Sequence, residues 1–335
     1  MKIICTKSNL AKGVNIVSKA VPSKTTMPIL ECILIDAKIF SEIVRKLPDN
    51  EITIESDSNL QTMITCEKAK FSISAKSGED FSYLPYIEKA ESITLSQFTL
   101  KELIRQTIFS IADNDSNKLM TGELFEIDEN ILKVVSLDGH RISIRKTELT
   151  KNYQSRKVVI PGKTLMEVSK ILSGEADSTV CLSFTDNHVV FEFDNTVVVS
   201  RLIEGEYFRI DQMLSSDYET KVKINKKELL SCIDRATLLV KEGDKKPIII
   251  NIMDEVMELR IKSQLGSMNE EIMISKEGKD LLIGFNPKFL IDALRVIEDE
   301  EVTIYLMNAK APCFIRDEKE SYVYLILPVN FNAGV

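Results

Sequence analysis

Three segments of the chain share one order of hydrophobic and polar positions. Each starts with a short apolar run near Lys2, Ser92 or Lys221 and continues into a stretch whose apolar residues lie three or four apart. Alternation of apolar and polar residues is typical of a half-buried strand, whereas apolar residues three to four positions apart are typical of an amphipathic helix. The pattern predicts a strand followed by a helix at the start of three repeats.

A second helix and an alternating strand follow in each repeat. The second helices are expected to start near Lys38, Lys163 and Lys288. The strands after them are expected at residues 51–54, 179–184 and 301–306. Because every repeat pairs helices with sheet strands, we expect an α+β fold with domains at residues 1–90, 91–214 and 215–335.

The first repeat is shorter than the other two. In the first repeat, 28 residues separate Leu10 of the first helix from Lys38 of the second. The matching residues are 63 apart in the second repeat (Leu100 and Lys163) and 59 apart in the third (Leu229 and Lys288). The shortfall falls just before Lys38, where the later repeats place several strands. About three strands are therefore expected to be missing from the first domain.

Composition favours an ordered soluble protein. The 335 residues suffice for two to three domains, and 44% hydrophobic with 28% charged residues excludes disordered and collagen-like classes. No apolar stretch approaches the ~18 residues of a membrane span, and the start lacks a secretory core, so we expect a cytoplasmic protein with no membrane partner. The net charge of −8 argues against a general nucleic-acid coat but leaves room for a local basic surface.

The residues that carry catalysis or bind metals form no recognisable constellation. The chain has two histidines, His140 and His188, and its six cysteines form no C-x-x-C pair. It also lacks the G-x-G-x-x-G and G-x-x-x-x-G-K-[ST] patterns of nucleotide binding. We therefore expect no cofactor, no metal and no enzymatic activity, with an enzyme whose active site goes unrecognised as the alternative.

The chain resembles the bacterial sliding clamps, the beta subunits of DNA polymerase III, over essentially its whole length. The segments that carry the resemblance are residues 1–4, 28–30, 137–142, 159–163, 283–286 and 324–329. It implies the DNA clamp fold and a head-to-tail homodimer, whose six domains close a ring around duplex DNA with helices lining the hole. The family normally has more strands before Lys38, and it usually ends near Phe331.

The resemblance also implies a hydrophobic cleft for short peptide segments of partner proteins. The partners would be the catalytic subunit of the replicative polymerase, the clamp loader and other proteins with a clamp-binding motif. The cleft positions are Met120, Leu137, Gly139, His140, Arg141, Ile142, Phe208, Met213, Leu325, Ile326, Leu327, Pro328 and Val329. Without the resemblance, the apolar residues among them would be interpreted as a plain core cluster.

Sliding requires attraction to DNA phosphates without recognition of bases, since base-specific hydrogen bonds would hold the ring at one sequence. Lysines and arginines on helices that face the hole meet this need. Lys24 and Lys118 match DNA-contacting positions of the family. The other candidates are Lys12, Lys101, Arg105, Lys226, Lys227 and Arg235.

Ring closure in the family joins the first domain of one subunit to the third domain of the other. The matching apolar positions are Phe71, Ile73, Leu238 and Leu239. The charged residues expected to face one another are Lys68, Lys70, Glu270 and Glu271. Because the first domain is short, the alternative is a monomeric, truncated clamp that binds partner peptides without encircling DNA.

Overall fold

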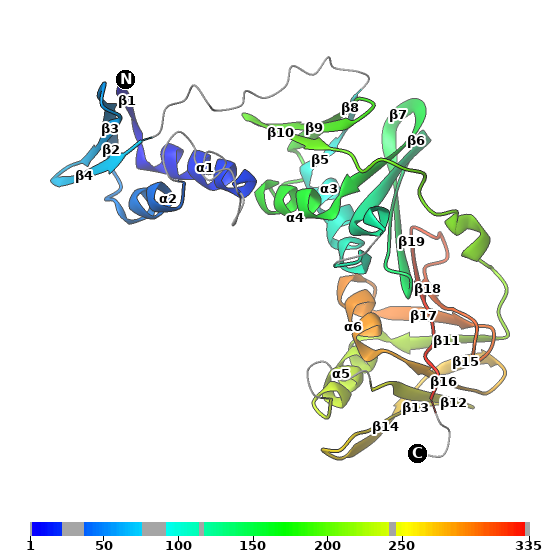
Figure 1. Cartoon of the computed structure of the whole chain (residues 1–335). Coiled ribbons are helices and arrows are strands. Elements are labelled where there is room, and N and C mark those ends of the chain that lie inside the picture. The colour runs from blue at the N-terminus through cyan, green and yellow to red at the C-terminus, as the bar shows by residue number, and fades with distance from the viewer. Residues whose placement is uncertain (1, 22–36, 76–91, 114–116, 241–245, 332–335) are drawn as a thin grey trace. The chain divides into compact units, whose positions relative to one another are not determined.

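The computed structural model describes residues 2–21, 37–75, 92–113, 117–240 and 246–331. The chain divides into two compact units, residues 1–87 and 88–335, which are described separately below (Figure 1). Within the described ranges, none of the helices combines the length and apolar character needed to cross a membrane.

The first unit packs two helices against one four-stranded antiparallel sheet. Its elements are β1 (Lys2–Thr6), α1 (Lys7–Val17), a 3₁₀ turn (Ser18–Ala20), α2 (Ala37–Lys46), β2 (Glu51–Ser56), β3 (Gln61–Cys66) and β4 (Ala69–Ser74). The strand order is β1-β2-β3-β4. Val14, Phe40 and Val44 from the helices meet Ile52 and Ile64 of the sheet in its core.

The predicted absence of about three strands concerns the link between α1 and α2. The described residues of this link form only the 3₁₀ turn at Ser18–Ala20. Residues 22–36, which include Lys24 and the segment 28–30, lie outside the described part of the chain. The shortened first domain therefore stays a prediction.

The second unit starts with a domain built on a long hairpin. Its elements are β5 (Ser92–Ser96), α3 (Gln97–Arg105), 3₁₀ turns at Ile108–Ser110 and Lys118–Thr121, β6 (Gly122–Leu137), β7 (Arg141–Pro161), α4 (Gly162–Ile171), β8 (Thr179–Phe184), β9 (His188–Phe193), β10 (Thr196–Arg201) and a 3₁₀ turn at Ile210–Met213. Strands β10-β9-β8-β5 form one sheet. The hairpin β6–β7 belongs to another, which continues into the next domain.

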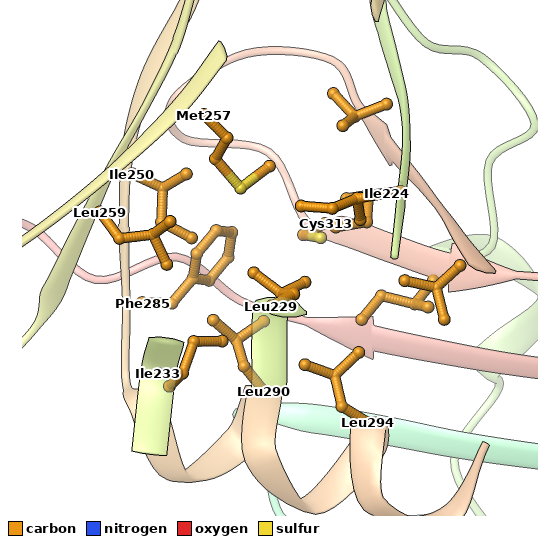
Figure 2. Packing of buried hydrophobic residues seen from close by; sticks show 14 of the residues in the cluster. Ile224, Leu229, Ile233, Ile250, Met257, Leu259, Phe285, Leu290, Leu294 and Cys313 are labelled. Carbon is orange, nitrogen blue, oxygen red and sulfur yellow. The ribbon is translucent and has the colours of Figure 1, made fainter. Parts of the chain in front are cut away.

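The last domain repeats this order. Its elements are β11 (Thr220–Asn225), α5 (Lys226–Thr237), β12 (Ile248–Met253), β13 (Val256–Lys262), β14 (Ser267–Met273), β15 (Ser275–Gly278), β16 (Leu281–Phe285), α6 (Pro287–Val296), β17 (Glu301–Leu306), β18 (Cys313–Arg316) and β19 (Tyr322–Ile326). Leu229 and Ile233 of α5 gather with Leu290 and Leu294 of α6 around Phe285 in the core (Figure 2).

Each repeat begins in the same way because the strand ends on a residue that caps the following helix. The hydroxyl of Thr6 accepts a hydrogen bond from the backbone N–H of Asn9, and that of Ser96 accepts one from Thr99. The side chain of Asn225 accepts two, including one from Lys227. Side-chain acceptors of this kind satisfy backbone donors that the first helical turn leaves free. The predicted α+β fold with three repeated clamp domains is confirmed.

One seven-stranded sheet joins the two domains of the second unit. Its order is β15-β11-β17-β18-β19-β7-β6, so the hairpin of one domain extends the last sheet of the other. The joining strands β7 and β19 run antiparallel, with Ile142 opposite Leu325. Backbone hydrogen bonds therefore fix the relative placement of the residues that these two strands carry.

Candidate functional site

An apolar cluster covers one face of the joined sheet. Leu137 of β6 lies opposite Ile142 of β7, which in turn lies opposite Leu325 of β19. These three side chains form the floor and are at most 6% exposed. The half-buried side chains packed on this cluster include Met120 and Phe208. A buried floor with accessible walls can take up apolar side chains of another molecule.

Two of the predicted cleft residues are exposed apolar side chains. Met213 is 52% exposed at the end of a 3₁₀ turn, and Leu327 is 37% exposed just after β19. The backbone N–H of Leu327 donates a hydrogen bond of 2.9 Å to the carbonyl of His140. This bond fixes the chain after β19 beside the turn that joins β6 to β7.

That turn depends on Asp138 and Gly139. The Asp138 carboxylate accepts hydrogen bonds from the backbone N–H groups of His140 and Arg141, at 2.9 and 3.1 Å. Gly139 has a φ of +83°, a left-handed conformation that side chains disfavour. The turn therefore needs glycine for its backbone, and nothing lies within 4 Å of where a Cβ would be.

Arg141 supports the turn from inside the protein. Its side chain is 6% exposed and contacts the carboxylates of Asp138 at 3.0 Å and Asp292 at 2.7 Å. It also donates to the carbonyl of Phe109, and its guanidinium lies 4.5 Å from the ring centre of Phe289. Arg141 can therefore hold the turn in place, but its charge is not accessible at the protein surface.

Two of the predicted cleft residues lie on opposite faces of β19. Leu325 faces the apolar cluster, whereas Ile326 is 1% exposed in the core of the last domain. Successive strand residues point to opposite faces, so Ile326 lies on the face of β19 opposite to Leu325. Pro328 is half-buried, and the N–H of Val329 donates to the carbonyl of Gly284 at 2.9 Å.

Several predicted DNA-binding cations are occupied by contacts within the chain. The ammonium of Lys101 donates to the carbonyl of Leu172 at 3.4 Å, and that of Lys226 donates to the carbonyl of Ile297 at 2.5 Å. Both carbonyls follow the last residues of helices, where positive charge is favourable. The cations therefore stabilise the ends of α4 and α6.

The two predicted arginines form ion pairs, and three lysines are exposed. Arg105 lies 2.5 Å from Glu102 and 3.3 Å from Glu298, and Arg235 pairs with Glu270. The hydrogen bond to Glu270 raises the pKa of Arg235 above its usual value. The exposed lysines are Lys12, Lys118 and Lys227. These three are the stronger candidates for phosphate contact.

The predicted interface residues lie at the open edges of two sheets. Phe71, half-buried Ile73 and exposed Lys70 are on β4, and exposed Lys68 precedes it. Glu270 and exposed Glu271 are on β14. Leu238 is 77% exposed just after α5, and Leu239 next to it is half-buried. Within the described ranges, β4 and β14 each pair on one side only.

Sequence reasoning missed a buried carboxyl on β6. Glu123 of β6 is fully buried, and neither carboxyl oxygen has a hydrogen-bond partner among the described residues. The hydroxyl of Thr107 lies near it but donates its proton to the carbonyl of Leu103 at 2.7 Å. Burial raises the pKa of Glu123 from 4.5 to about 8. No motif flags this residue, because a glutamate in a long strand is usually expected to face solvent.

It also missed the residues that hold the turn. Phe289 and Asp292 lie three positions apart on α6 and so share one helix face, but only the fold brings that face to Arg141. His140 lies over the same Phe289 ring, with ring centres 6.1 Å apart. In the part of the chain that the structure describes, no group of three histidine, cysteine or acidic side chains is placed to hold a metal.

Family models and known proteins agree on what this chain is similar to. Models of the DNA polymerase III beta subunit match its N-terminal domain at residues 31–85, its central domain at 94–208 and its C-terminal domain at 211–330. The beta sliding clamp of Bacillus subtilis is 32% identical, with 98% of this chain and 99% of that protein covered. The beta sliding clamp of Staphylococcus epidermidis is 31% identical, with 98% and 88% covered.

Solved structures give the same result. A putative DNA polymerase III beta subunit from Eubacterium rectale is 67% identical with a TM-score of 0.97, and 99% of this chain and 100% of that one are covered. The sliding clamp from Bacillus subtilis is 32% identical with a TM-score of 0.94 and the same coverage. The chain therefore belongs to the beta sliding clamps, the beta subunits of DNA polymerase III. Members of this family are non-catalytic processivity factors in DNA replication.

Proposed function

We propose that this protein is a homodimeric ring that encircles duplex DNA, slides on it and tethers the replicative polymerase through the cleft. The observation that carries the proposal is the apolar floor of Leu137, Ile142 and Leu325, held on one continuous sheet and open at Leu327. The clamp loader and other motif-bearing proteins would use the same cleft. Such a subunit contributes no catalysis itself, and a replication role places it in the cytoplasm.

The internal joint of the second unit supports a head-to-tail ring. At this joint, the hairpin β6–β7, which lies between helices α3 and α4 of one domain, extends a sheet of the next domain. The pairing strands are β7 and β19. The first domain ends its sheet at β4, and the last domain offers β14 from the strands between its helices. Repeating the internal joint between subunits would place β14 of one protomer beside β4 of its partner. Apolar Phe71 and Leu238 lie exposed near these edges and would be buried there.

Light scattering at low micromolar concentration tests ring closure. We expect a mass of twice the 37.9 kDa subunit, and a Leu238→Asp variant should fall to the subunit mass because a charge would be buried in the interface. Met166→Asp on α4 is the matched control, since Met166 is also an exposed apolar residue, 40% accessible. A wild-type monomer would instead favour the truncated clamp that binds peptides without encircling DNA.

The cleft itself is tested with a short peptide. Leu327→Ala should weaken binding of a fluorescein-labelled peptide with two leucines and a phenylalanine as anchors by about tenfold, because each buried apolar side chain contributes about 1.5–3 kcal/mol. Fluorescence polarisation measures the Kd. Leu265→Ala, a change at a leucine that is 57% exposed in a distant turn, should leave it unchanged. Equal affinities for both variants would remove Leu327 from the cleft.

A further inference from the structure

A second cavity adjoins the cleft. It has a volume of about 550 Å³ and lies between the segment 202–211 and the outer face of β6 and β7. Its apolar wall includes Leu124, Val159, Ile203, Tyr207 and Phe208. The wall has an ordered shape, because Val159 pairs with Ile203 in an isolated bridge and the Tyr207 and Phe208 rings meet edge to face, 5.6 Å apart.

The cavity and the cleft share one apolar cluster. Leu124 and Val159 are buried in the same cluster as Leu137 and Leu325 of the cleft floor. Phe208 is a predicted cleft residue and also lines the cavity. The proposed cleft and the cavity therefore share part of their apolar surface, with Phe208 common to both.

The cations that line the cavity are already matched by anions. Glu126 lies 2.7 Å from Lys133 and 2.6 Å from Lys157, so its carboxylate lies between the two ammonium groups. Arg209 contacts Glu206 at 3.5 Å. These pairs involve every lysine and arginine of the lining.

The cavity lining holds more acidic than basic side chains. Asp186 and Glu204 are exposed, and neither forms an ion pair with any residue that the structure describes. Asp211 is already 3.7 Å from Lys133. The lining as a whole holds five acidic and three basic side chains, and Asp186 and Glu204 account for the surplus of negative charge.

We propose that this cavity receives an arginine or lysine that flanks the apolar anchors of a partner peptide. The inference rests on the proposed function of the cleft and extends it, since it names a chemical preference outside the anchors. The long aliphatic stem of such a side chain would cover Leu124, Val159 and Phe208, while its charged head reaches Asp186 and Glu204. An acidic flanking residue would meet uncompensated carboxylates instead.

Five versions of one labelled probe, of three kinds, test this preference. The first is the peptide with two leucines and a phenylalanine as anchors, the second adds two arginines at one end, and the third adds two glutamates at that end. Each extension is made separately at the N-terminus and at the C-terminus. We expect arginines at one of the two ends to lower the Kd of the wild-type protein about 3- to 10-fold. The gain should shrink between 50 and 300 mM salt, because the pairs are exposed.

Charge-removing variants decide whether the cavity is responsible. The double variant Asp186→Asn, Glu204→Gln should lose the gain from arginine and bind the unextended peptide as the wild type does. Asp254→Asn, Glu255→Gln removes a matched exposed acidic pair from the β12–β13 turn and should keep the gain. Loss of the gain in this control, no gain in the wild type, or a gain from glutamate would overturn the proposal. If the unextended peptide fails to bind, the proposed cleft fails as well.

Discussion

Glu123→Met should stabilise the protein most at alkaline pH and flatten the dependence of its stability on pH. Burial raises the pKa of this carboxyl to about 8 in the folded protein, from an ordinary value of 4.5. In the folded state the Glu123 carboxyl therefore keeps its proton over a pH range in which the same carboxyl of the unfolded chain has lost it. A methionine has similar length, fits an apolar site and carries no charge to desolvate.

The sign of the effect follows from proton binding. The folded state holds the Glu123 proton more tightly than the unfolded chain does. This tighter binding adds fully to the free energy of unfolding below pH 4.5, and the added stability is lost as the pH rises to about 8. Within that window the slope is roughly 1.4 kcal/mol per pH unit, because one proton is released on unfolding. Tyr207 is the nearby titratable group, and its pKa is raised by burial and then by Glu123, so it remains neutral throughout this pH range.

Urea midpoints at pH 5, 7 and 9 measure this effect. Glu123→Met should exceed the wild type most at pH 9, whereas Glu123→Gln should also lose the pH slope but gain less stability, since its amide remains without partners. Glu148→Gln changes an exposed glutamate on β7 and should follow the wild-type curve. A wild-type slope that persists in Glu123→Met would show that another group titrates.

The periodicity of the chain was enough to predict the repeated strand and helix, because the caps Thr6, Ser96 and Asn225 and the buried faces are local properties. In an unbroken run of apolar residues, local patterns do not show which side chains face the core and which face the other side of the sheet. Residues 324–329 are such a run, and only pairing with β7 shows that Leu325 faces the cleft while Ile326 faces the core.

The state of the predicted cations also depended on distant parts of the chain. Lys101 and Lys118 look alike in sequence, but the end of α4 lies beside Lys101 and provides the carbonyl of Leu172. Lys118 has an exposed side chain. Arg141 is the extreme case, because its partner Asp292 is 151 residues away in sequence. The turn at Asp138 and Gly139 could be located from sequence, but the distant residues that hold it in place could not.

Arg141→Ala should cost both stability and peptide affinity, although Arg141 is too buried to touch a peptide. Its loss leaves the carboxylates of Asp138 and Asp292 without their shared cation and the Phe109 carbonyl without its donor. Removing one partner of a buried ion pair typically costs about 3–5 kcal/mol, because the remaining charges stay desolvated. The turn that carries His140 then loses its support, and Leu327 loses a fixed acceptor.

Arg141→Lys separates charge from geometry. A lysine keeps the positive charge but cannot place donors on Asp138, Asp292 and Phe109 at once, since only the guanidinium has a planar fork of donors. We therefore expect Arg141→Lys to recover part of the urea midpoint and little of the affinity for the unextended peptide. Arg295→Ala is the control on α6, because Arg295 is exposed and pairs with half-buried Asp234. If Arg141→Ala behaves like this control in both measurements, the buried arginine does not hold the cleft, and the paired strands β7 and β19 position it alone.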